Sequence, residues 1–303
     1  AGVLLQLMRR KLEAAGGAVL SGRAFRTVRA TAAGPLAVEV ELERLDTGAI
    51  ERFSARLLLD GMGSTSPLAL RRHSGRPFAG VCPTVGTVAA GFARGEGPGE
   101  VDLSLGEILV SVADAQRGEQ LMWEGFPGRG DELTVYLFYY STVEPADKGS
   151  PLRGLRPGGP RYSLLDLFEQ YFLLLPSYKR PGPGFRHVKP VYGYIPARHS
   201  LRRQEAPLLR GVLPVGDSAA QQSPLTFCGF GSHVRNLGRT TALLDYALRH
   251  GLLEPAQLAR ISPFQTNVSL NWVFSRFMQP WEGPSDVNRL QNLFLQVLSE
   301  QGE

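Results

Sequence analysis

The 303 residues have an ordinary globular composition, 43% hydrophobic and 20% charged, which suffices for one or two domains with a large core. Two cysteines exclude a disulfide scaffold, and no apolar run reaches the roughly 18 residues that span a bilayer. The net charge of +5 suits an anionic cofactor, an anionic membrane surface or a basic surface without a partner. Nucleic acid is disfavoured, because no basic motif is interleaved with aromatic residues.

The first part of the chain predicts a helix followed by strands. Apolar residues at helical spacing indicate an amphipathic helix over 1–15, which Gly16 and Gly17 end. The turn Asp46-Thr47-Gly48 predicts a hairpin between the last two strands. The predicted strands are 18–20, 36–45 and 50–59.

The middle of the chain is rich in strands and predicts an antiparallel sheet. Its strands, bounded by Gly, Pro or Asp, are 81–93, 107–113, 120–124 and 133–141. A helix is predicted from Ser163 to about Leu174, where Pro176 stops it. The Pro- and Arg-rich connection that follows holds one short strand, 188–194.

At Val212 the pattern returns to α/β, with a short apolar strand that closes on Gly216-Asp217 and a helix from about Gly231 to His250. The predicted fold class is therefore α/β, with an antiparallel β-sheet domain inserted into it. The expected domains are 1–75 together with 206–252 for the α/β part, 76–205 for the inserted sheet, and 253–303 for a C-terminal helical region.

Gly216-Asp217 is the strongest single signal for a ligand. A strand that ends in Gly-Asp places a carboxylate at the sheet edge, where it can accept a hydrogen bond from a sugar-like hydroxyl. The helix that follows can aim its N-terminal amides at a pyrophosphate. The alternative is that Asp217 only caps a helix.

A second strand end strengthens this interpretation. The apolar run 57–59 leads into the turn Asp60-Gly61-Met62-Gly63-Ser64, which by itself is an ordinary turn. With Gly216-Asp217 it gives two apolar strands, far apart in sequence, that both end in Asp/Gly turns and flank the inserted sheet.

Three segments then carry a resemblance to a known family. Residues 222–232 (QSPLTFCGFGS), 80–86 (GVCPTVG) and 122–127 (MWEGFP) resemble segments of FAD-dependent lycopene cyclases of the CruA/CruP type, most of all the CruP branch. The resemblance covers the chain from about Leu4 to Met278. It implies a Rossmann-like FAD-binding domain, built as in aromatic hydroxylases and geranylgeranyl reductases, around the inserted sheet.

The resemblance also implies where the cofactor binds. The cofactor is FAD, with NADPH as a candidate reductant, and the implied contacts are Asp60, Gly61, Gly63, Gly216, Asp217, Ser223, Pro224, Gly229 and Gly231. The family's GxGxxG segment, which holds the FAD pyrophosphate, has no counterpart in the sequence. Because the chain opens on Ala1 in a helical pattern, we expect it to be truncated at its N-terminus. Cys228 stands where the family has Gly, and Asn236 where it has His.

Glu124 is the candidate catalytic residue. It is a carboxylate in an apolar strand segment, where burial would raise its pKa and keep it protonated. Such an acid could protonate the end of a polyene, and an acidic residue at a similar place is thought to do so in other lycopene cyclases. The alternative is an exposed strand glutamate. The aromatic residues Tyr136, Phe138, Tyr139, Tyr140, Tyr192 and Tyr194 could line a tunnel or simply form core.

The leading hypothesis is thus a lycopene cyclase-like flavoprotein of carotenoid metabolism, which closes a ring with no net redox change. The resemblance places it in a chloroplast or a cyanobacterial cell, peripheral to the thylakoid membrane. Two alternatives stay open. One is a FAD-dependent isoprenoid reductase or monooxygenase, and the other is a non-catalytic paralogue or fragment.

Overall fold

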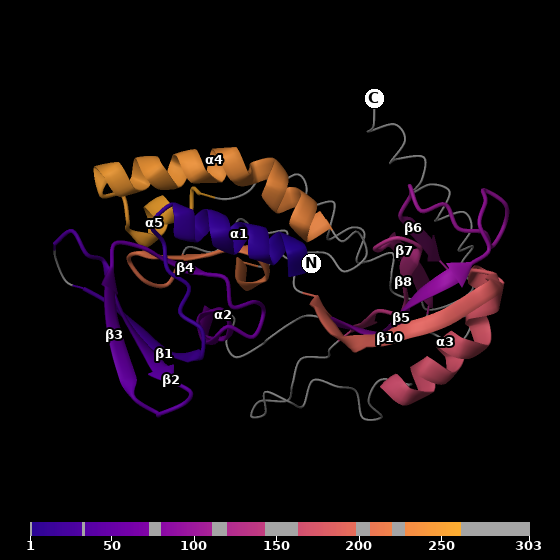
Figure 1. The fold of residues 1–303 in the computed structure, drawn as a ribbon. Helices are drawn as coiled ribbons and strands as arrows, with labels where there is room; N and C mark the ends of the chain where they lie inside the picture. The colour runs from indigo at the N-terminus through magenta and orange to yellow at the C-terminus, as the bar shows by residue number, and fades with distance from the viewer. Residues whose placement is uncertain are drawn as a thin grey trace, which may run out of the picture. The chain divides into compact units, whose positions relative to one another are not determined.

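The computed structural model describes residues 2–31, 34–72, 80–110, 120–142, 163–197, 207–219 and 228–261 (Figure 1). The chain divides into two compact units, each assembled from segments that are distant in sequence. The first contains Ala1–Asp60, Glu205–Pro214 and Gly238–Ser262. The second contains Gly61–Gln204 and Val215–Leu237.

The first unit opens with the predicted amphipathic helix, α1, Gly2–Ala14. Gly16 ends it in the left-handed region at φ +83°, where a side chain would be strained. The Gly17 N–H then donates to the Leu12 carbonyl over 2.9 Å. The pair Gly16-Gly17 therefore closes the helix as its sequence predicts.

Three antiparallel strands follow, in the order β1-β2-β3: β1 Arg23–Ala30, β2 Val38–Arg44 and β3 Ile50–Ala55. The predicted hairpin turn joins β2 and β3, with Gly48 at φ +72° and its N–H donating to the Arg44 carbonyl over 2.8 Å. The strand predicted at 18–20 is wrong, because β1 begins at Arg23. Arg23 of β1 forms an ion pair with Glu51 of β3 at 3.0 Å, although β2 lies between the two strands.

Two short apolar strands form a parallel pair within the first unit. β4, Leu58–Asp60, pairs with β11, Val212–Pro214, so that Asp60 lies opposite Pro214. The strand predicted over 50–59 is thus two strands, which belong to different sheets. Since parallel strands end at the same edge, the turns that follow β4 and β11 leave the pair side by side.

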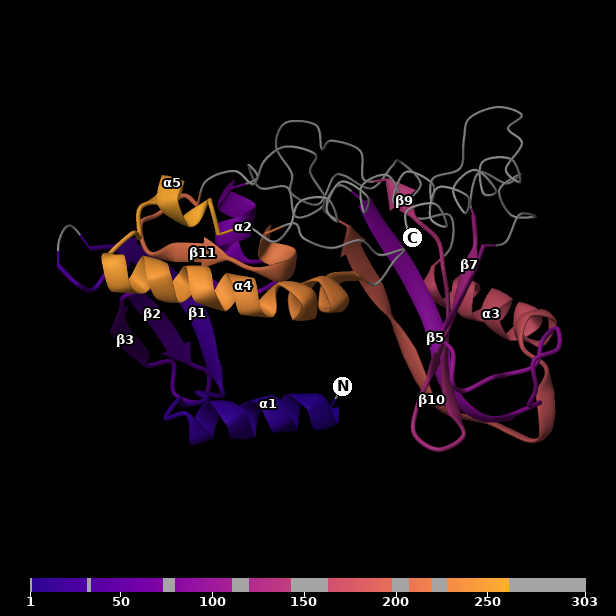
Figure 2. The ribbon, with the colours of Figure 1, turned by 90° about the horizontal axis from the view of Figure 1, so that it is seen from above.

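The second unit is built on a six-stranded antiparallel sheet, which confirms the antiparallel sheet predicted for the middle of the chain. Its order is β10-β5-β8-β7-β6, and β9 pairs with β5. The strands are β5 Gly80–Phe92, β6 Glu107–Val110, β7 Met122–Pro127, β8 Glu132–Phe138, β9 Ser141–Thr142 and β10 Pro181–Ala197. β5 and β10 lie side by side over most of their length (Figures 1 and 2).

β10 is far longer than the predicted strand 188–194. Its prolines argue against a central strand, but β10 is an edge strand, where proline needs no partner for a missing N–H. The pairing with β5 has register shifts between Pro181 and Arg186 and between His187 and Lys189. Such irregularities accommodate residues that cannot take part in a regular ladder of hydrogen bonds.

One helix, α3, Leu164–Tyr178, covers one face of this sheet (Figure 2). Ser163 and Asp166 start it with a capping box, whose two hydrogen bonds measure 3.1 and 3.0 Å. Pro176 does not stop the helix, contrary to the sequence prediction. It lies in the last turn, where the Lys179 N–H still donates to the Leu175 carbonyl over 2.8 Å.

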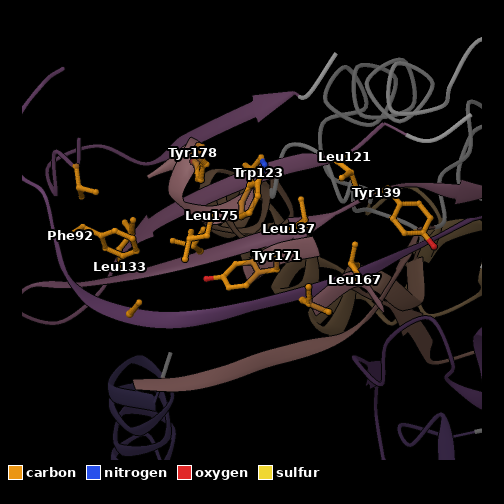
Figure 3. Close-up of a cluster of buried hydrophobic side chains, with 14 residues drawn as sticks. Phe92, Leu121, Trp123, Leu133, Leu137, Tyr139, Leu167, Tyr171, Leu175 and Tyr178 are labelled. Carbon is orange, nitrogen blue, oxygen red and sulfur yellow. The ribbon is translucent and has the colours of Figure 1, made fainter. Parts of the chain in front are cut away.

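The core of the second unit lies between α3 and the sheet (Figure 3). The Trp123 ring stacks on Tyr178 at 5.0 Å between centroids and lies 5.6 Å from Tyr171. The Tyr171 hydroxyl is satisfied by Thr87 at 2.7 Å. These contacts fix which face of β7 points to the helix.

The remaining described elements are short, apart from one helix. They are α2 Pro67–Arg72, the 3-10 helix η2 Gly216–Ala219, α4 Cys228–His250 and α5 Pro255–Leu258. α4 begins three residues before the predicted start and ends at the predicted His250. Of the C-terminal helical region, only α5 falls within the described residues. No helix in the described ranges is long and apolar enough to cross a membrane.

Candidate functional site

Glu124 lies in the middle of β7, between β8 and β6 in the sheet. Its register partners are Tyr136 in β8 and Ile108 in β6. Side chains alternate along a strand, and the neighbouring Trp123 belongs to the core under α3. Glu124 therefore points to the opposite face of the sheet.

The side chain of Glu124 is fully buried, and no described residue forms a hydrogen bond with its carboxyl group. Its exposed fraction is 0%, and neither carboxyl oxygen has a hydrogen-bond partner in the described part of the chain. Burial raises the pKa of Glu124 to about 9, because a carboxylate without water or donors is strongly disfavoured. The alternative of an exposed strand glutamate is wrong, and the group is a neutral acid at pH 7.

Cys82 and Tyr136 share the surroundings of this carboxyl. Burial raises the pKa of the Cys82 thiol, and a charge on Glu124 would raise it further. The pKa of Tyr136 is raised by burial first and by Glu124 second. Tyr136 also contacts the Phe126 ring, with 6.1 Å between the ring centroids. The acid thus lies among groups that stay neutral at physiological pH.

The predicted aromatic residues divide between different surroundings. Tyr139 belongs to the core cluster with α3, so the core alternative holds for it. Tyr136 and Phe138 occupy the face of β8 that bears Glu124, because they alternate with the core residues of that strand. Tyr192 and Tyr194 are exposed, at 66% and 53%. A polyene tunnel stays a prediction.

The turn after β4 holds three of the predicted cofactor contacts. Asp60 closes the strand and is 1% exposed. A Cβ added to Gly61 would lie 3.8 Å from the Val215 side chain, so the turns after the two parallel strands are in contact. Gly63 has φ +80°, and no atom of the described residues lies within 4 Å of its Cβ position.

The turn after β11 holds Gly216 and Asp217. Gly216 has φ +63°, and a Cβ on it would lie 3.2 Å from Nε2 of His233 in α4, so a side chain there would meet both strain and the imidazole. Ser218 fixes the turn, since its Oγ accepts from the Val215 N–H over 3.1 Å and donates to the Val215 carbonyl over 2.8 Å.

Asp217 is half-buried inside η2, not at the residue before it, so capping that turn is not its role. Burial raises the pKa of the Asp217 carboxyl, and nearby His233 opposes that shift. Sequence reasoning did not link His233 to Gly216, because nothing in the local pattern signals this contact. Ser223 and Pro224 lie outside the described residues, and Gly229 and Gly231 lie in the first turns of α4.

No protein-family model matches the chain. No curated protein matches it either. In the described ranges, no group of His, Cys, Asp and Glu side chains could hold a metal ion.

Solved structures do resemble it. CmlS, a flavin-dependent halogenase, matches with a TM-score of 0.56 and 16% identity over 96% of this chain and 50% of its own. RebC, soaked with chromopyrrolic acid and holding 7-carboxy-K252c, matches with a TM-score of 0.50 and 16% identity over 92% of this chain and 49% of its own. A complex of aklavinone-11 hydroxylase with FAD and aklavinone matches with a TM-score of 0.47 and 18% identity. The match covers 78% of this chain and 39% of the hydroxylase.

The likenesses to CmlS and RebC show the fold. The chain shares the mixed α/β fold of CmlS, with an antiparallel sheet inserted into the α/β part. It spans about half the length of the solved structures that it resembles.

Proposed function

We propose that this chain is part of a flavoprotein in which Glu124 donates the proton that starts cyclisation of a carotene end group. The observation that carries the proposal is the state of this carboxyl. It is fully buried, it has no hydrogen-bond partner among the described residues, and its pKa is raised to about 9. A carboxylic acid that is neutral at pH 7 in an apolar site is suited to giving a proton to a carbon–carbon double bond.

The described residues at the strand ends fit FAD. Asp217 offers a half-buried carboxylate that can accept a hydrogen bond from a ribityl hydroxyl, at a turn whose Gly216 no other residue could replace without strain. In the turn after β4, the space beside Gly63 lets a ligand approach the backbone closely. The fold shared with the flavin-dependent CmlS adds support.

In the proposed reaction, the Glu124 proton goes to the terminal double bond of the polyene. The resulting carbocation adds to a nearby double bond of the same chain and closes the ring. The Glu124 carboxylate then takes up the proton that a neighbouring ring carbon releases, so a new double bond forms and the acid is neutral again. Bound reduced FAD would supply electron density that stabilises the developing positive charge, with no net electron transfer. Buried Met122 and Phe138, at 1% exposure each, help to keep water from the cation.

A second candidate is a FAD-dependent isoprenoid reductase or monooxygenase. Its support is the fold that the chain shares with CmlS, a flavin-dependent halogenase. Product analysis in a lycopene-accumulating host separates the two candidates. Cyclisation leaves the mass of the carotene unchanged and adds a ring, whereas reduction or oxygenation changes the mass. A product of altered mass would reject the cyclase.

Asp217→Ala should weaken flavin retention by about tenfold or more, since hydrogen bonds to charged groups contribute about 1.5–3 kcal/mol. The measurement is the flavin content of the whole purified protein, followed by titration of FAD into the apoprotein. Asp245→Ala in α4 is the matched control, because Asp245 is exposed and forms an ion pair with Arg249 at 2.9 Å on the same helix. If Asp217→Ala keeps full flavin occupancy, Asp217 is not a FAD contact.

We also propose a peripheral contact with an anionic membrane, in a chloroplast or a cyanobacterial cell. The support is the net charge of +5 and the insolubility of carotenes in water. The attraction should fall as salt rises. Flotation with anionic liposomes at low and high salt measures it, and a protein that stays unbound at low salt would refute the contact.

A further inference from the structure

The imidazole of His233 lies against the turn that contains Gly216. A Cβ added to Gly216 would lie 3.2 Å from Nε2 and 3.7 Å from Cε1 of His233, so the ring occupies the side of the turn where another residue would carry its side chain. Both residues belong to the second unit, so the contact lies within one compact part of the chain. His233 is exposed, and an imidazole in contact with water can carry a positive charge.

The charge of His233 acts on the Asp217 carboxyl, which directly follows Gly216. Burial raises the pKa of Asp217, and His233 lowers it. A cation that lowers the pKa of a carboxyl group stabilises its ionised form. The ionised form matters for a cofactor, because a charged acceptor makes a stronger hydrogen bond to a hydroxyl than a neutral one does. His233 therefore favours the state of Asp217 that binds a ribityl hydroxyl more tightly.

Other charged residues lie on the same elements or on elements in contact with them. α2 contacts η2 and carries Arg71 and Arg72 in its last turn. Arg235 follows His233 by two residues in α4 and is exposed, and residues two apart on a helix do not face the same way. Among the charged side chains of the described residues, His233 is the one whose charge shifts the pKa of Asp217.

We infer that His233 is a positioning residue for the cofactor, which keeps Asp217 ionised and thereby sets the pH range in which the protein retains FAD. The inference rests on the proposed contact between Asp217 and the ribityl chain. Lowering the pH protonates Asp217 and replaces a charged acceptor by a neutral one, so FAD binding weakens. The positive charge of His233 moves this loss to lower pH, and its removal should bring the loss back to higher pH.

The test is the dissociation constant of FAD, measured by titrating FAD into the whole apoprotein between about pH 4.5 and pH 8. His233→Gln keeps a hydrogen-bonding side chain and removes the charge. It should weaken FAD binding about two- to fivefold at the acid end, the effect expected of a partly exposed ion pair. At the alkaline end the two proteins should bind FAD equally, because Asp217 is ionised in both. A purely structural role for His233 would weaken binding by the same factor at every pH.

Arg235→Gln is the matched control, because it removes an exposed cation from the same helix, two residues away from His233. It should leave the pH profile of FAD binding unchanged.

A double-mutant cycle tests whether His233 acts through Asp217. In an Asp217→Asn background, His233→Gln should have no further effect on FAD binding, since the amide has no charge to maintain. A His233→Gln profile parallel to that of the unmodified protein, an equal shift in Arg235→Gln, or additive effects of His233→Gln and Asp217→Asn would overturn the inference. Full FAD binding by Asp217→Ala is a different result, because it rejects the proposed Asp217 contact itself.

Discussion

Replacing Glu124 by Gln should abolish nearly all ring formation while the fold and the flavin remain. A positioned general acid contributes about 10²–10⁴-fold in rate, and the amide has no acidic proton to give. Because the carboxyl is already neutral when buried, Gln retains both its shape and its lack of charge. The measurement is the carotene composition of a lycopene-accumulating host that expresses the whole protein.

Glu132→Gln is the control for this experiment. Glu132 lies in β8 of the same sheet and is half-buried, but it pairs with Ala90 at the far end of the strand from Phe138. Replacing Glu132 should leave the yield of ringed carotene unchanged. If Glu124→Gln makes as much ringed product as the unmodified protein, the role of Glu124 is refuted. If neither makes any, the isoprenoid-redox or non-catalytic alternative gains.

The features that the sequence predicted well are those with a local cause. Gly16 and Gly48 adopt the left-handed backbone that glycine favours, so the ends of α1 and of the β2–β3 hairpin were predictable. The apolar neighbours of Glu124 predicted its burial, since an alternating strand with apolar residues on both faces leaves no solvent side.

The features that were missed depend on the rest of the fold. β1 carries three arginines and is a strand because β2 supplies its pairing and Glu51 its counter-charge. β10 is long because its prolines fall on an edge. No local pattern could place the His233 imidazole against Gly216 or show that Tyr136 shares a face with Glu124, because both follow from tertiary packing and register.

The free energy of unfolding should fall as pH rises from about 4.5 to about 9, because of Glu124. Its pKa is raised from 4.5 to about 9 in the folded protein by burial. Below pH 4.5 the group is protonated in both states, so its contribution to stability is fully present. Between the two values the unfolded chain releases the proton and the folded chain keeps it, so that contribution is lost at about 1.4 kcal/mol per pH unit.

Glu124→Gln removes this dependence. The variant should be more stable than the unmodified protein at pH 8 by several kcal/mol, while the two should be close at pH 4.5. Urea denaturation of both proteins between pH 5 and pH 8.5 measures the difference. His187, whose pKa is lowered by burial, contributes the opposite slope equally in both proteins and cancels. Parallel curves would show that Glu124 is not held as a buried neutral acid in solution, and the proton-donor proposal would lose the observation that carries it.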